Sequence, residues 1–180
     1  MYITIVQNYP IYAAMIQFAI LGTLGGCIAR CIQNKKIYFP LTIKEAIWYP
    51  ITWAFLGVLI KLAFLGFRGF IDILVESEYL PYIFSDKGNK FLQAFALSTI
   101  MNLQFGPLLI LLHRWLDYLP FGKTNWENID KALITLLWWW IPAHTITFML
   151  PTDYQIGLAA FWSVVLGFIL GLINKKGDKK

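Results

Sequence analysis

The chain has 180 residues, of which 58% are hydrophobic and only 14% are charged, and its mean hydropathy is +0.60. A water-soluble domain of this size needs more charge to cover its surface, so the composition excludes an ordinary soluble globular protein. The net charge of +5 does not indicate nucleic-acid binding, because the cationic residues are spread over several loops between apolar segments. We therefore expect an integral membrane protein with the lipid bilayer as its main partner and no nucleic-acid partner.

Five apolar segments follow one another along the chain, each about as long as the hydrocarbon core of a bilayer. Their apolar runs are near-continuous rather than alternating, and lipid cannot satisfy exposed backbone groups, so the spans must be helices. We predict an all-α, polytopic transmembrane helix bundle that forms a single domain over residues 1–180. The connection at 151–153 is so short that the last two spans should form a tight helical hairpin. The predicted spans are Ile11 to Ile32, Ala46 to Leu65, Phe91 to Trp115, Ala132 to Leu150 and Tyr154 to Ile173.

Three prolines and one amphipathic stretch interrupt this simple pattern. Pro50, Pro107 and Pro142 lie inside or at the edge of apolar segments, where a proline removes a backbone hydrogen bond and kinks the helix. The stretch from Gly66 to Leu80 mixes charged with bulky apolar side chains, which predicts an amphipathic segment at the membrane interface. The alternative, a sixth span within Gly66 to Phe84, stays open.

The distribution of lysine and arginine predicts the orientation in the membrane. With five spans, the loops on one side carry most of the cations, and the loops on the other side carry only Arg68, Lys87 and Lys90. The positive-inside rule then places the N-terminus outside and the C-terminus inside a bacterial cytoplasmic membrane or an organelle inner membrane. The predicted inner cations are Arg30, Lys35, Lys36, Lys44, Arg114, Lys123, Lys131, Lys175, Lys176, Lys179 and Lys180.

Polar residues at bilayer depth are the candidates for a functional site, because each is costly there unless it finds a partner or water. We expect Lys61, His144, Gln17, Asn102 and Gln104 to converge in one hydrated layer, with Lys61 as a fixed positive charge. Each member also has a plain structural interpretation. Lys61 can extend its ammonium group to the outer surface, His144 can be a neutral core histidine, and the amides can join helices.

Trp140 closes a run of three tryptophans just before Pro142, and it is the remaining candidate site residue. Such a large aromatic side chain facing the bundle interior would form a hydrophobic constriction or a stacking surface for a solute. Plain packing or lipid contact is the simpler alternative.

Small residues mark the first and last spans as close-packing helices. Gly22 and Gly26 lie one turn apart in the first span, and Gly167 and Gly171 do so in the last. Such stripes let helix backbones approach each other closely. We favour a contact between these two helices inside the bundle over a homo-oligomer formed through either face.

The sequence contains no motif that indicates catalysis. It lacks a zinc-protease His-Glu-x-x-His, a Gly-x-Ser-x-Gly elbow and a phosphate-binding P-loop. Cys27 and Cys31 lie one helical turn apart with no further metal ligand nearby, so they are interpreted as packing residues. We expect neither an enzyme nor a metal or cofactor site.

A set of short motifs is distributed along the chain: Tyr9-Pro10, Arg30, Gln33, Gly106-Pro107, His113, Trp115, Leu116-Asp117, Trp140, Pro142, His144, Phe148, Pro151, Gln155 and Trp162. These motifs resemble the family of small peroxisomal and mitochondrial inner-membrane proteins founded by the mitochondrial DNA depletion protein. Their order along the helices and their spacing differ from that family's pattern, with Gly106-Pro107 in the third span here and in the second there. The resemblance implies a small channel or solute pathway whose solute is poorly defined.

The function predicted from these observations is a channel or binding pathway for a small polar or anionic solute. Two other classes stay open. One is the substrate-binding membrane subunit of an energy-coupled importer, which the size and small-residue helix faces also fit. The other is a structural or assembly protein that transports nothing.

Overall fold

The computed structural model describes residues 1–123 and 126–173, and this part of the chain is helical with no β-strand. The all-α prediction is confirmed. Part of the predicted inner charge, Lys175, Lys176, Lys179 and Lys180, lies outside the described residues. The α-helices are α1 (Tyr2–Asn8), α2 (Pro10–Gln33), α3 (Ile43–Glu76), α4 (Lys90–Tyr118), α5 (Ile129–Thr135), α6 (Ile141–Met149) and α7 (Thr152–Ile173), with short turns η1 (Tyr82–Phe84), η2 (Leu119–Phe121) and η3 (Leu136–Trp140).

Four helical segments are long and apolar enough to cross a membrane, and they mark the chain as an integral membrane protein. They coincide with the first, third, fourth and fifth predicted spans. The predicted tight hairpin is confirmed as well, because α7 begins three residues after α6 ends. The four segments are Pro10–Gln33, Lys90–Phe121, Ile129–Met149 and Thr152–Leu172.

The second predicted span, Ala46 to Leu65, lies within α3, which is not among those four. A capping box of Thr42 and Glu45 begins this helix, and its 34 residues make it about 51 Å long at a rise of about 1.5 Å per residue. The helix runs without interruption from this predicted span into the predicted amphipathic stretch, as far as Glu76. In this stretch Ile71 is buried and Arg68 donates to Gln155 of α7 over 3.0 Å, so the amphipathic stretch continues α3 along the bundle.

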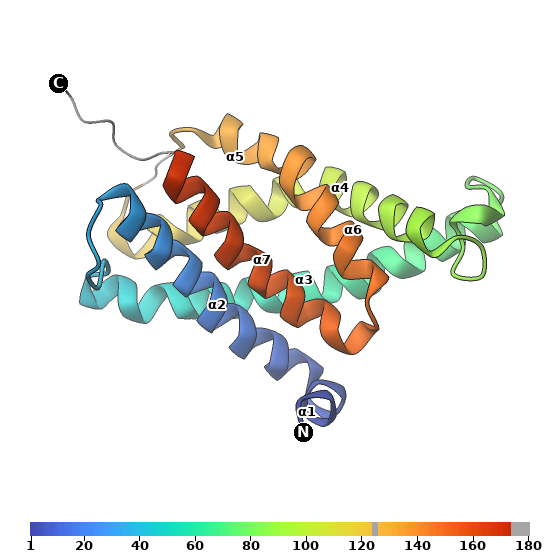
Figure 1. The fold of residues 1–180 in the computed structure, drawn as a ribbon, viewed down its shortest axis with the longest axis horizontal. Helices are drawn as coiled ribbons and strands as arrows, with labels where there is room; N and C mark the ends of the chain where they lie inside the picture. The colour runs from blue at the N-terminus through green and yellow to red at the C-terminus, as the bar shows by residue number, and fades with distance from the viewer. Residues whose placement is uncertain (124–125, 174–180) are drawn as a thin grey trace.

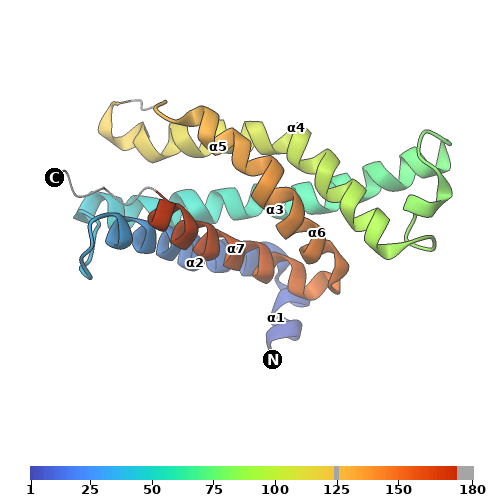
Figure 2. The same cartoon turned by 45° about the horizontal axis from the view of Figure 1, so that its top comes forward.

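Five helices pack in a closed ring. α2 lies between α3 and α7, α4 lies between α3 and α6, and α6 contacts α7. Figures 1 and 2 show α2 and α7 side by side, with α4 and α5 on the opposite side of α3. This ring encloses the interior in which the candidate site lies.

The contact between α2 and α7 is a glycine contact of two backbones. A Cβ atom built on Gly25 would lie 2.5 Å from the carbonyl oxygen of Ser163, and one on Gly167 would overlap the carbonyl of Gly25. The predicted packing of the first and last spans against each other is therefore confirmed. Gly22 instead faces the indole of Trp53 on α3, while a Cβ on Gly26 would meet nothing within 4 Å. A homo-oligomer stays a prediction.

Pro142 shapes the fourth span. It occupies the first turn of α6, and the five residues before it, Leu136–Trp140, form a π-helical turn. Because proline has no N–H and its ring collides with the carbonyl four residues earlier, the regular hydrogen-bond ladder cannot pass this point. The wider π turn accommodates the interrupted hydrogen bonding, and it determines the direction in which Trp140 points.

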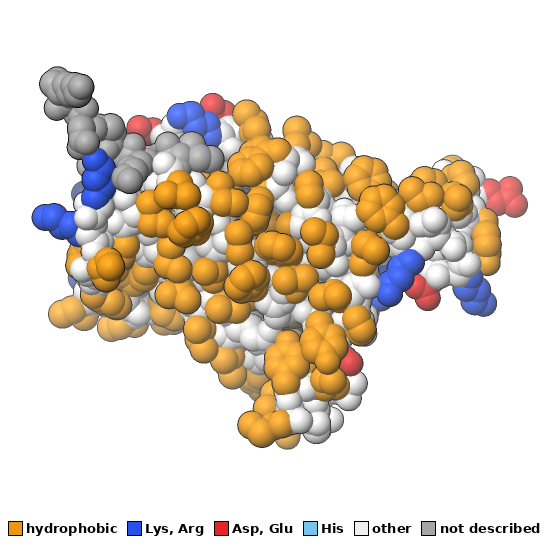
Figure 3. Space-filling model, viewed as in Figure 1, with side chains coloured by type: hydrophobic (Ala, Val, Ile, Leu, Met, Phe, Trp, Pro, Cys, Tyr) orange, Lys and Arg blue, Asp and Glu red, His pale blue; other side chains and the backbone are white. Residues whose placement is uncertain are grey.

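The surface matches a membrane environment. Large apolar side chains such as Ile16, Leu65 and Leu108 are 60–70% exposed on the outer faces of their helices. Figure 3 shows hydrophobic side chains over the middle of the molecule, with most of the charged side chains toward its ends. So broad an apolar surface would be unfavourable in water, whereas it is favourable in contact with lipid.

Candidate solute-binding cavity

A cavity of about 360 Å³ lies inside the ring. Helices α2, α3, α4, α5, α6 and α7 and the π turn all contribute to its wall. Along α4 the lining extends from Met101 to Asp117, which corresponds to about 24 Å at the helical rise. The cavity is therefore long and narrow and runs parallel to α4.

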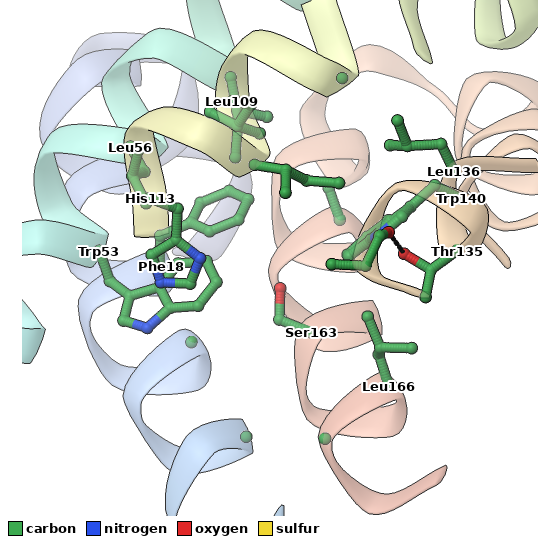
Figure 4. Close-up of a pocket in the computed structure, with 18 of the residues that line it drawn as sticks. Phe18, Trp53, Leu56, Leu109, His113, Thr135, Leu136, Trp140, Ser163 and Leu166 are labelled. Atoms are coloured by element: carbon green, nitrogen blue, oxygen red, sulfur yellow. Dashed lines mark hydrogen bonds between the residues drawn. The ribbon is translucent and has the colours of Figure 1, made fainter. Parts of the chain in front are cut away.

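Most of its wall is apolar. Phe18, Trp53 and Leu56 form one side, and Leu136 and Trp140 form the other (Figure 4). Phe18 and Trp53 stack with ring centroids 6.3 Å apart, so this side is rigid.

Polar groups gather at one end, where α4 meets α6. The side-chain nitrogen Nδ2 of Asn102 donates to the backbone oxygen of Ser98 over 2.8 Å and lies 3.1 Å from Nδ1 of His144. Asn102 is 3% exposed and His144 is 8% exposed. The hydroxyl of Ser98 in turn donates to the carbonyl of Ile141, so this network ties α4 to α6 beside the proline kink.

Aromatic rings close this end of the cavity. Phe64 meets His144 edge-on at 5.6 Å, and Trp140 stacks on His144 at 5.1 Å. Phe148 completes the group by packing against Phe64 with ring centroids 4.7 Å apart. Phe64 and Met101 line the cavity here and, with Phe148, belong to the buried core, so we call it the closed end.

Ionisable side chains form the opposite end, which we call the mouth. His113 lies 3.4 Å from Asp117, one helical turn further along α4, and its ring packs 4.4 Å from that of Trp53. The two side chains are 30% and 27% exposed, far more than Asn102. Arg114 also lines this end. No group of three His, Cys, Asp or Glu side chains able to hold a metal occurs within residues 1–123 and 126–173.

An ion pair beside the mouth fixes the first loop. Arg30 at the end of α2 donates to Glu45 over 2.9 Å and also to the backbone oxygen of Pro40 and the hydroxyl of Tyr49. Burial raises the pKa of Glu45, but hydrogen bonds from Arg30, Thr42 and Tyr49 outweigh it and lower the pKa to about 2. The carboxylate therefore stays ionised and holds α2, the loop and α3 together.

The structure brings only some of the predicted site residues together. Asn102, His144 and Trp140 line the cavity, as expected of a shared site. Gln104 is exposed on the outer face of α4, and Gln17 accepts a hydrogen bond from Tyr2 over 3.3 Å. Neither is among the cavity-lining residues in the described part of the chain.

Lys61 also lies away from the cavity. Its neighbours Ile60 and Phe64 face the interior, whereas Lys61 is half-buried on the adjoining face of α3. No hydrogen bond or ion pair of its ammonium group is found within residues 1–123 and 126–173. Lys61 therefore does not line the cavity with Asn102 and His144, because successive residues of a helix point about 100° apart.

Most lining residues were not identified as site candidates from the sequence, among them His113, Asp117 and Ser163. His113 and Asp117 were detectable, because they share the helix face of Asn102, Gly106 and Leu109 at spacings of three and four residues. Ser163 lies one helical turn before Gly167, in line with the small residues of the last span. Its hydroxyl is buried beside the cavity without a hydrogen-bond partner in the described residues.

No protein-family model, curated protein or solved structure matches this chain. The resemblance to the mitochondrial DNA depletion protein family stays a prediction.

Proposed function

We propose that the protein binds a small solute in this cavity as one step of a pathway across the membrane. The observation that carries the proposal is the cavity itself, with apolar walls, buried polar groups at one end and ionisable groups at the other. Small-molecule sites in proteins have this character and volumes of about 300–1,000 Å³. An apolar protein cavity of about 150 Å³ holds benzene, so this one has room for a ligand of roughly twice that size.

The closed end favours a gated pathway over an open channel. Phe64, Phe148 and His144 pack across the interior, so a bound solute passes only if these rings move. A carrier or the binding subunit of an energy-coupled importer operates in this way, whereas an open pore needs a continuous hydrated path. We therefore place these two classes ahead of a simple channel.

Orientation follows from the predicted charge asymmetry. The mouth lies at the end of α4, next to the loops that carry Arg30, Lys36 and Lys123. Under the positive-inside rule this is the inner side. The proposed cavity is then open to the inside and closed toward the outside.

Ligand binding in lipid nanodiscs tests the proposal. We suggest three fluorinated probes on one ring system: 6-fluoro-2-naphthamide, 6-fluoro-2-naphthoate and 6-fluoro-2-naphthylmethylamine. ¹⁹F NMR line broadening reports binding, and empty nanodiscs correct for partition into lipid. At least one probe should bind the wild type in competition with an unlabelled copy of itself.

A pair of glycine variants locates the binding. Gly26 lines the cavity and Gly66 does not, and a Cβ at either position would meet nothing within 4 Å. Gly26→Trp should therefore block probe binding, while Gly66→Trp should bind like the wild type. If no probe binds, or if both variants lose binding equally, the proposal is wrong and a structural role is favoured.

A further inference from the structure

We infer that the cavity selects solutes whose deeply buried group is uncharged and offers both a hydrogen-bond acceptor and a hydrogen-bond donor, as a carboxamide does. This inference rests on the proposed function. It assigns recognition of that group to Asn102, His144 and Ser163, three side chains on α4, α6 and α7 that are more than nine-tenths buried and line the cavity.

The first step concerns the amide of Asn102. Its neighbour at 2.8 Å is the backbone oxygen of Ser98, which can only accept, so the atom that faces it must be the NH₂ group. This group has two hydrogens, and Nδ2 also donates to the hydroxyl oxygen of Ser98 over 3.3 Å. Because both of those acceptors belong to Ser98, we assign one hydrogen to Ser98 and the other to Nδ1 of His144, 3.1 Å away. Both donors of Asn102 are therefore used inside the bundle. Its carbonyl oxygen Oδ1 has no partner among the described residues and remains available as an acceptor.

The second step concerns the tautomer of His144. Because Asn102 donates to Nδ1, this nitrogen carries a lone pair, and the proton of the neutral ring is on Nε2. No partner for Nε2 occurs within residues 1–123 and 126–173. Trp140 and Phe64 cover the ring by stacking and by an edge contact, which leaves the rim of the imidazole for the cavity. His144 therefore offers one donor, Nε2–H.

Ser163 supplies a third group. It lies on α7 between the two apolar sides of the cavity, and its hydroxyl points into the space between them (Figure 4). The oxygen is buried and makes no hydrogen bond in the described part of the chain. A hydroxyl both donates and accepts, so it can serve either partner group of a solute.

None of the described side chains that line the closed end is charged. Arg114, the nearest lining cation along α4, is twelve residues from Asn102, or about 18 Å. A carboxylate or ammonium group placed beside His144 would lose its hydration without gaining an opposite charge. An uncharged group that accepts a hydrogen bond from Nε2 of His144 and donates one to Oδ1 of Asn102 avoids this cost of burying a charge. The solute is therefore neutral at its buried end, which replaces the expectation of an anionic solute paired with Lys61.

The naphthalene probes test this selectivity, because the three differ only in the polar group. At pH 7 the naphthamide should bind at least about tenfold more tightly than the naphthoate anion and the naphthylmethylammonium cation. The two ions lose their hydration in the cavity, and neither makes the paired hydrogen bonds of an uncharged amide. Asn102→Leu should reduce naphthamide affinity about tenfold. Ser163→Ala should reduce it about threefold, and this variant removes no hydrogen bond of the bundle.

Thr99→Val is the matched control. Like Ser163, Thr99 has a buried hydroxyl without a hydrogen-bond partner in the described residues, but Thr99 is on α4 and does not line the cavity. The affinity of the Thr99→Val variant for the naphthamide should equal that of the wild type. Equal binding of all three probes, or an equal loss in Thr99→Val and Ser163→Ala, overturns the selectivity while the proposed function stands. Failure of every probe to bind overturns both.

Discussion

Gly25 and Gly26 are neighbours on α2, and the structure predicts opposite effects of the same alanine substitution. A Cβ at Gly25 would lie 2.5 Å from the carbonyl oxygen of Ser163 and 3.2 Å from the Cα of Val164. Relaxed carbon contacts need about 3.5–4.0 Å, so the helices must separate by roughly 1 Å. Both obstacles are backbone atoms, and neither can rotate away.

The magnitude follows from comparing the two variants. Each gains about 1 kcal/mol of helix propensity when glycine becomes alanine. Both variants share that gain, so the difference between their free energies of unfolding reports only the overpacking of α2 against α7. Such overpacking costs about 1–3 kcal/mol. Gly26→Ala should therefore be as stable as the wild type or more stable, and Gly25→Ala should be less stable than Gly26→Ala by that amount.

Unfolding by SDS in mixed micelles, followed by tryptophan fluorescence, measures this difference. The midpoint of Gly25→Ala should lie at a lower SDS fraction than that of Gly26→Ala. Equal midpoints for the two variants, or a greater loss in Gly26→Ala, would refute the glycine contact between α2 and α7. The ring that encloses the cavity would then need revision.

Three further predictions concern the mouth, the kink and the orientation. The pKa of Glu45 is lowered to about 2, so its ion pair stabilises the fold fully above the ordinary carboxyl pKa near 4.5, and this stabilisation is lost as the pH falls toward 2. In a plot of the SDS unfolding midpoint against pH, Glu45→Gln should therefore remove the decrease between these two pH values. Pro142→Ala should restore a regular helix, turn Trp140 away from the cavity and weaken naphthamide binding severalfold by ¹⁹F NMR. In a cysteine-free background, an impermeant maleimide added outside should label Lys87→Cys and spare Lys36→Cys, and the reverse pattern would contradict the predicted orientation.

Hydropathy was sufficient to predict the four segments that are long and apolar enough to cross a membrane, because lipid permits little besides long apolar helices. It also predicted a further span within α3, which is not among those four. The hairpin before α7 followed from the short segment 151–153, and the contact of α2 with α7 followed from glycine spacing. The packing of the amphipathic stretch beyond Gly66 against α7 and the core was not predictable in the same way. It depends on tertiary partners of Arg68 and Ile71 that local sequence does not contain.

The site was predictable only in part. Buried polar residues are rare enough in a membrane helix that Asn102 and His144 could be selected, and the structure joins them across 42 positions of sequence. Which face of a helix points inward depends on rotations set by packing. Lys61 and Gln104 show this, since each lies within three residues of a cavity-lining side chain and still faces away from the cavity.

The central claim is that the His144–Asn102 edge binds an uncharged polar group of a solute. ¹⁵N NMR of histidine-labelled protein tests it most directly, because the chain has only two histidines and His113→Gln leaves one signal pair. We predict a neutral ring with its proton on Nε2, and a shift of that Nε2 signal when 6-fluoro-2-naphthamide is added. A proton on Nδ1, or an Nε2 signal that the bound naphthamide leaves unchanged, would contradict the account.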